Sequence, residues 1–204
     1  DAAGLTGERV REEDIGFRLA PRLNAAGRLD HAKEAVELLV SDNPETCAAT
    51  AERLCELNEA RRTEQKKTSE DAETRAQAQG MTQRRGIVLA SQEWHPGVVG
   101  IACSRLVERF GRPTLLLCQR GDELTGSGRS IDAFDLHAAI AACAEHLVSF
   151  GGHRAAAGLR LKRHNLDAFR DAFLAHCDAQ LTDADLSPAV RYDTTARLSE
   201  LTVP

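Results

Sequence analysis

The sequence predicts an α/β fold, a sheet flanked by helices, preceded by a helical segment with a long helix. Two aliphatic runs, 87–90 and 113–118, have the length of buried strands, and an amphipathic helical pattern at 98–110 separates them. A glycine-broken strand pattern follows at 124–131. Upstream, a single helical pattern extends from residue 44 to residue 80. This alternation of strands and helices is typical of an α/β domain.

The N-terminal part is expected to become helical only after residue 30. Residues 1–30 are polar and irregular, and Asp30 is placed to cap a short helix. Asn43 is the expected N-cap of the long helix, which carries a proline in its first turn and ends at Gly80. Residues 59–79 are polar all round, which is typical either of a solvated helix or of one that joins two lobes across a cleft.

The C-terminal part is expected to complete the sheet and its helical cover. A helix over 134–150 precedes a short strand at 157–161 and a further helix at 165–180. The remaining residues, 181–204, are interpreted as a connection into another unit. No internal repeat is visible.

Composition limits the class of protein. Hydrophobic residues make up 42% of the chain and charged residues 28%, which is ordinary for a soluble protein, and no apolar run is long enough to span a membrane. We therefore expect a cytoplasmic protein with no membrane partner. The net charge of −5 excludes a uniformly basic nucleic-acid surface but leaves room for a local positive groove. The chain begins without methionine and stops in a polar segment, so we expect a fragment of a longer protein.

Cysteine usage points to the same compartment. None of the six cysteines forms a CxxC pair, and most lie in apolar periodic segments. They are predicted to be reduced core residues and not zinc ligands.

The segment Gly151-Gly152-His153 is followed only by small residues and one arginine as far as Gly158. Glycine has no Cβ and so lets a ligand approach the backbone, and His153 supplies one polar donor. A structural turn would explain the two glycines but not the histidine and the alanines. We interpret this segment as a place where the backbone meets a ligand.

Ser127-Gly128-Arg129-Ser130 combines two hydroxyls, a permissive backbone and a guanidinium. Successive N–H groups near a glycine can form an anion-binding concavity, and the arginine fork matches two phosphate oxygens. A polar strand end would look similar. His95 precedes a helix whose first donors, at residues 97–99, are expected to offer a second anion site, although a plain strand-to-helix turn is also compatible. Arg28 likewise follows a run of small residues.

A hydrolytic metal centre is not predicted. No dense Asp/His cluster of the kind that holds two metal ions is present, and the acids Asp132 and Asp135 are explained by capping of the following helix. No nucleophile elbow, Walker loop or dinucleotide fingerprint occurs. The chain is expected to hold a phosphate and not to activate water.

Four motifs, in this order and spacing, resemble the RecJ family of single-strand-specific DNA exonucleases in the DHH phosphoesterase superfamily: Phe17–Leu29, His95–Ile101, Gly126–Ser130 and Gly151–Gly158. The resemblance covers nearly the whole chain. It implies a DHH-associated domain with a central mixed sheet at 81–180. Residues 1–80 would be the tail of the metal-binding lobe plus a linker helix, and 181–204 would lead into the next domain.

The resemblance also implies roles for residues. Ser127, Arg129 and His153, with Gly128, Ser130, Gly151 and Gly152 around them, would contact the terminal or scissile phosphate of single-stranded DNA. Arg28 would help to grip the 5′ end, and His95 would be a phosphate neighbour or stand behind the groups in contact. Manganese or magnesium would be held by residues outside this chain, so the chain alone is expected to be inactive. A single-strand-binding protein and a helicase are possible partners of the full-length enzyme.

Two alternatives stay open at this point. The chain could belong to a DHH-family phosphatase of short oligonucleotides (a nanoRNase), although the Phe17–Leu29 motif resembles RecJ in particular. It could also be a non-catalytic nucleic-acid-binding module of the DHH-associated type, such as those appended to alanyl-tRNA synthetases.

Overall fold

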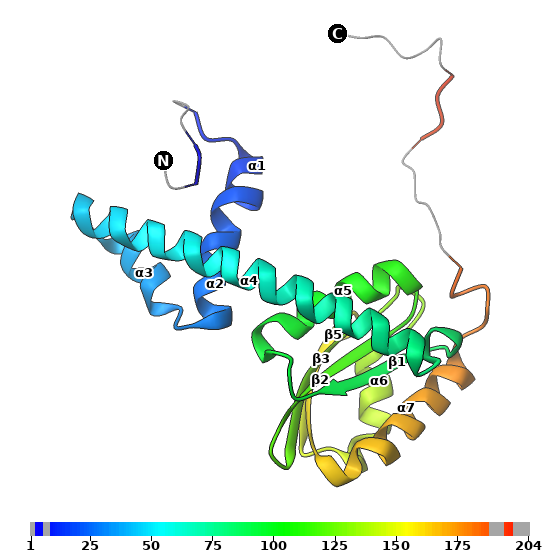
Figure 1. Cartoon of the computed structure of the whole chain (residues 1–204). Coiled ribbons are helices and arrows are strands. Elements are labelled where there is room, and N and C mark those ends of the chain that lie inside the picture. Colours follow the sequence, from blue (N-terminus) through cyan, green and yellow to red (C-terminus); the bar gives the residue numbers. More distant parts are fainter. Residues whose placement is uncertain (1–2, 6–8, 188–193, 198–204) are drawn as a thin grey trace.

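A computed structural model describes residues 3–5, 9–187 and 194–197, and it shows a helical unit and an α/β unit joined by one long helix (Figure 1). That helix, α4, spans Pro44–Ala78. None of the described helices is long and apolar enough to cross a membrane.

The helical unit comprises α1 (Glu12–Asp14), a π-helical turn (Ile15–Leu19), α2 (Ala20–Leu29) and α3 (Lys33–Val40). The prediction that the first thirty residues are irregular is therefore wrong for most of this segment. Pro21 lies in the first turn of α2, where its missing N–H has no cost, and the helix packs small side chains against α4. A separate small core results, made of Ala25, Ala26, Ala35, Leu54 and Leu57.

The predicted cap at Asp30 is also wrong. Asp30 is the residue at which α2 ends, and its carboxylate accepts a hydrogen bond from the backbone N–H of His31 at 2.9 Å. The N-cap of α3 is Ala32, which has no capping side chain. The intervening turn leaves Asp30 two positions too early to reach the free donors of α3.

The start of α4 confirms the expected cap, and its second half is packed on one side. The Asn43 side chain accepts hydrogen bonds from the N–H groups of Glu45 and Thr46 at 2.9 and 3.1 Å. Small buried residues of the second half, including Ala72 and Ala76, lie against α5 (Pro96–Phe110). The long helix thus joins the two units, as one of the two interpretations of its polar sequence expected.

The sheet is mixed and five-stranded, in the order β1-β2-β3-β5-β4. Its strands are β1 (Ile87–Ser91), β2 (Thr114–Arg120), β3 (Glu123–Arg129), β4 (Ser149–His153) and β5 (Ala156–Lys162). Only β1 and β2 pair in parallel among these neighbours; the other pairs are antiparallel. The expected mixed sheet with flanking helices is confirmed.

Helices cover both faces of the sheet (Figure 1). On one face α5 packs on β2 and β3, with α4 behind it. On the other lie α6 (Leu136–Ala142) and α7 (Leu166–Gln180). The main core fills both layers and includes the aliphatic interiors of β1 and β2, Trp94, Phe134, Phe169 and Phe173.

The predicted helix over 134–150 is wrong at both ends. Asp135 caps α6 through the N–H of Ala138 at 2.9 Å, but the helix ends at Ala142, and a 3₁₀ turn at Ala144–His146 follows. The chain then becomes β4, because Ser149–His153 pairs with β5 along its whole length. Two adjacent glycines interrupt helical propensity there, and sheet pairing decides the conformation.

Strand β3 is continuous although it contains two glycines. A Cβ on Gly126 would lie 2.4 Å from Leu117 Cδ2, and one on Gly128 would lie 2.4 Å from Leu115 Cδ2. These glycines make room for the large side chains of β2 and do not break the strand, contrary to expectation.

Candidate functional site

Three neighbouring strands bring the predicted motifs into register. Arg129 on β3 lies opposite Ala156 on β5, which lies opposite His153 on β4. Two residues along, Ser127 lies opposite Gly158, which lies opposite Gly151. Opposed residues share a face of the sheet, and so do residues two apart on one strand. The Ser127 and Arg129 side chains and the His153 side chain therefore project from one face.

Small residues form the floor between these polar groups. Ala156 and Gly158 occupy the middle strand, and Gly151 completes the floor on β4. A Cβ at Gly151 would meet no atom within 4 Å, and one at Gly158 would meet only the Gly126 carbonyl oxygen at 3.6 Å. With strands about 4.8 Å apart, β3 and β4 are separated by roughly 10 Å. A phosphate group placed on this floor can be reached from both sides.

Helix α5 fixes one wall of the site. A Cβ on Gly100 would lie 3.1 Å from Arg129 Nη2 and 3.5 Å from Ser127 Oγ. Gly100 thus lets β3 present both side chains beside the helix. Arg129 is half-buried, and its Nη1 donates to the carbonyl of Gly128 at 2.8 Å.

Helix α2 supplies the second wall. The Arg28 guanidinium donates to the carbonyl oxygen of Gly97 at 3.1 Å, although 69 residues separate the two. A Cβ on Gly97 would lie 1.9 Å from the carbonyl oxygen of Arg28, so the two backbones touch. Gly97 and Gly100 are three residues apart on α5, an axial rise of about 4.5 Å. Arg28 and Arg129 therefore contact the same helix at two positions about one turn apart.

The charge of these arginines is not neutralised by the protein. In the described part of the chain, Arg28 and Arg129 donate only to backbone carbonyls and form no ion pair with a carboxylate. Many other arginines do form one, for example Arg75 with Asp71 at 2.7 Å. A guanidinium that is held in place but left uncompensated is suited to an anionic ligand.

His95 caps α5 and occupies the donors that were expected to bind an anion. Its Nδ1 accepts from the N–H of Gly97 at 3.1 Å, and its carbonyl accepts from those of Val98 and Val99 at 3.1 and 3.3 Å. The expectation of a free anion site at this helix N-terminus is therefore wrong. Accepting at Nδ1 places the proton of the neutral imidazole on Nε2.

Three of the predicted residues lie away from the floor. By strand alternation Gly128 and Gly152 face the opposite side, and a Cβ on Gly152 would lie 2.4 Å from the Ala156 carbonyl oxygen. Ser130 donates its hydroxyl to the carbonyl of Phe134 at 3.0 Å. The N–H groups of β3 serve the sheet, because the strand pairs on both sides, so the expected backbone concavity does not form.

A buried cysteine on α5 forms a hydrogen bond to β3 at the site. Cys103 on α5 donates its thiol to the carbonyl of Ser127 at 3.1 Å. Burial raises the pKa of this thiol to about 12. At neutral pH it is protonated and acts as a structural donor; Cys118, Cys143 and Cys177 are likewise buried free thiols.

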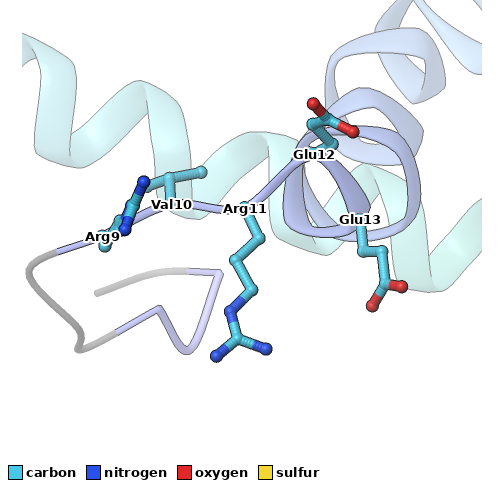
Figure 2. A pocket seen from close by; sticks show the side chains of 5 residues that line it. All are labelled: Arg9, Val10, Arg11, Glu12 and Glu13. Atoms are coloured by element: carbon cyan, nitrogen blue, oxygen red, sulfur yellow. The ribbon is translucent and has the colours of Figure 1, made fainter.

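Within the described ranges, no three His, Cys, Asp or Glu side chains gather closely enough to hold a metal ion. A hollow near the start of α1 is lined by five consecutive residues of mixed charge, whose side chains point in different directions (Figure 2): Arg9, Val10, Arg11, Glu12 and Glu13. It does not share a residue with the floor or its walls.

Sequence reasoning missed the two glycines of α5. Gly97 is expected from the sequence only as a helix donor and Gly100 only as part of a motif, yet they set the approach of α2 and of Arg129. Their spacing of three residues in an amphipathic helix was the available signal, because it places both on one face.

Comparison with known proteins shows which family the chain resembles. The DHHA1 domain family matches residues 83–178. The single-stranded-DNA-specific exonuclease RecJ of Bacillus subtilis is 37% identical over 204 residues, covering 99% of this chain and 26% of its own length. RecJ of Escherichia coli is 36% identical over 181 residues, covering 85% of this chain and 31% of its own length.

Solved structures of RecJ have a similar fold. RecJ from Thermus thermophilus in complex with Mn²⁺ superposes with a TM-score of 0.78 at 32% identity, over 87% of this chain and 26% of that one. A second structure, exonuclease RecJ bound to manganese, gives 0.77 over 89% of this chain and 44% of that one, also at 32% identity. The chain thus spans about a quarter to a third of the length of the curated relatives named above. With 37% identity to RecJ over 99% of its length, a matching fold and a DHHA1 domain, the chain belongs to the RecJ family.

Proposed function

We propose that this chain is the phosphate-binding part of a metal-dependent exonuclease that degrades single-stranded DNA from the 5′ end, in DNA repair and recombination. One observation carries the proposal: Ser127, Arg129 and His153 project from one sheet face around an open floor. The relatives named RecJ are single-stranded-DNA-specific exonucleases, which makes a DNA phosphate the best-supported ligand.

Each residue is assigned a contact. Arg129 would hold two phosphate oxygens with its planar fork, while the Ser127 hydroxyl would donate to a third. His153 would donate from the edge strand, and Arg28 would approach from α2. Gly151 leaves the floor open to a close approach, whereas Gly128, Gly152 and Ser130 shape the strands and the turn. His95 would act indirectly, by capping the helix whose glycines Gly97 and Gly100 lie against Arg28 and Arg129.

These donors suit a transition state more than a ground state. Charge builds up on the phosphoryl oxygens as a phosphodiester is attacked, and fixed cations stabilise that charge without reorganising. Mn²⁺ or Mg²⁺ would supply the attacking water and polarise the phosphate when bound. Its ligands are assigned to residues outside this chain, because the described residues offer no suitable cluster.

Recognition is proposed to depend on the backbone of the strand and not on its bases. Phe150 on β4 alternates to the other face, where its ring lies 5.7 Å from that of His137. Among the described residues, the strand positions around the floor carry no Phe, Tyr or Trp ring on which a base could stack, and the one imidazole there, that of His153, is assigned to the phosphate. Binding should therefore be insensitive to sequence and weakened by salt.

The organisation of the longer protein is proposed along the same lines. Residues 1–80 would be the end of a metal-binding lobe and its linker helix, 81–180 the DHH-associated domain and 181–204 the link to a further domain. The protein would act in the cytoplasm, with a single-strand-binding protein and a helicase as partners.

The chain alone is expected to bind single-stranded DNA without cutting it. A 3′-labelled oligothymidylate should remain intact with the purified chain and Mn²⁺, and should be shortened from its 5′ end by a longer protein that also carries a metal-binding lobe. Manganese-dependent cleavage by the purified chain would contradict the assignment. Preferential hydrolysis of dinucleotides by the longer protein would favour the oligonucleotide phosphatase, and no cleavage by it would favour a binding module.

A further inference from the structure

Arg61 on α4 is a guanidinium bound only by neutral groups. Its Nη1 donates to the Gln65 side chain at 3.0 Å and its Nη2 to the Asn58 side chain at 3.1 Å. Asn58 is itself buried. Nε of Arg61 is also buried, and it has no hydrogen-bond partner among the described residues. A buried donor left unpaired is unfavourable and calls for an explanation such as a bound ion.

The other arginines of the same helix are neutralised. Arg62, the next residue, is exposed and pairs with Glu59 at 3.3 Å. Arg53 pairs with Asp30 at 3.2 Å, and Arg75 pairs with Asp71 at 2.7 Å. Arg61 is thus the exception on α4 among the residues that the structure describes.

Of the neighbouring charges, that of Arg28 has the largest electrostatic effect on Arg61. Partial burial lowers the pKa of Arg61, and the charge of Arg28 lowers it further, with a larger influence than Arg62 or Glu59 on the same helix. Helix α2, which carries Arg28, packs on α4. Both guanidinium groups donate only to neutral acceptors among the described residues, and two such cations repel each other unless an anion lies close to both.

We propose that Arg61 and Arg28 together form a second phosphate-binding position, next to the one formed by Ser127 and Arg129. The inference rests on the proposed function and extends it. Arg28 contacts α5 at Gly97, about one turn from Gly100 and Arg129, so the two positions are neighbours along the same face of this helix. They would hold neighbouring phosphates of one single strand. Three of the five N–H donors of Arg61 are not used by Asn58 and Gln65, and a phosphate can occupy them once the side chain turns toward Arg28.

The test compares two adjacent arginines. Arg61→Gln removes the charge but keeps a polar side chain beside Asn58, and Arg62→Gln is the matched control. Affinity of the chain for a 5′-phosphorylated oligothymidylate is measured by fluorescence anisotropy over a salt series. We expect Arg61→Gln to weaken binding about tenfold at low salt and to reduce the slope of log K against log salt by about 0.7, the value for one phosphate of a single strand. Arg62→Gln should leave the slope unchanged.

A third variant separates charge from structure. Arg61→Lys keeps the cation, so it should retain the slope while losing part of the affinity, because lysine lacks the planar fork. Equal slopes for Arg61→Gln and Arg62→Gln would overturn the inference. Arg129→Ala, measured in parallel, separates failure of this inference from failure of the proposed function. If Arg129→Ala weakens binding while Arg61→Gln does not, only the second phosphate-binding position is wrong. If neither variant weakens binding, the proposed function fails as well.

Discussion

Replacing Arg129 by alanine is expected to reduce turnover of single-stranded DNA by roughly thirty- to a thousandfold in a longer protein that carries this chain and a metal-binding lobe. The range corresponds to about 2–4 kcal/mol of transition-state stabilisation, the typical loss when a charge-stabilising donor is removed. The fold should change little, because the guanidinium donates only to the neighbouring Gly128 carbonyl. Steady-state rates on a 5′-phosphorylated oligonucleotide and urea unfolding measure the two effects.

Controls for this variant come from the same region. Arg154→Ala removes an exposed arginine at the β4–β5 turn that donates to the Asp132 carbonyl, and it should leave the rate unchanged. Arg129→Lys should recover only part of the loss, because lysine cannot bind two oxygens at once. If activity survives both Arg129→Ala and His153→Ala, these residues do not bind the reacting phosphate.

Replacing Gly97 by alanine is expected to separate α2 from α5. The new methyl group would lie 1.9 Å from the carbonyl oxygen of Arg28 and 2.8 Å from its carbon, and both are backbone atoms that cannot rotate away. Overpacking of this kind costs about 1–3 kcal/mol of unfolding free energy. It should also displace Arg28 and lower DNA affinity to that of Arg28→Ala. Urea unfolding and anisotropy measure the two.

Gly100→Ala is the matched control on the same helix face. Its methyl group would meet the Arg129 side-chain end at 3.1 Å, and this group can move. Stability should be retained or rise by up to about 1 kcal/mol, because alanine favours the helix interior. DNA affinity should fall only because the Arg129 side chain is displaced. A Gly97→Ala variant as stable as the unmodified chain would contradict the described contact between α2 and α5.

Much of the α/β unit could be predicted because its signals are local. The aliphatic runs of β1 and β2 and the cap at Asn43 depend on nearby residues. Strand β4 could not be predicted this way, since none of the residues Ser149–His153 is buried and the segment is a strand only through its pairing with β5. The helical nature of α2 was hidden for a similar reason: its alanines matter only when packed on α4.

The candidate site shows the same division. Residue types alone pointed to Ser127, Arg129 and His153, and the register places them on one face. Sequence could not show that Gly128 and Ser130 face away, because that depends on the direction of β3 within the sheet. Nor could it show that His95 uses the helix donors itself. Contacts between distant segments, such as that of Arg28 with Gly97, cannot be predicted from local sequence patterns.

The central claim is that phosphate binds on the floor formed by β3, β5 and β4. Its most direct test is a ¹⁵N NMR titration of the chain with a 5′-phosphorylated oligothymidylate. We predict that amide shifts gather at Ser127, Arg129, Gly151 and His153, with Arg28 across α5, and that α7 on the opposite face is unaffected. Shifts confined to the α6–α7 face, or no shifts at these residues at saturating oligonucleotide, would contradict the account.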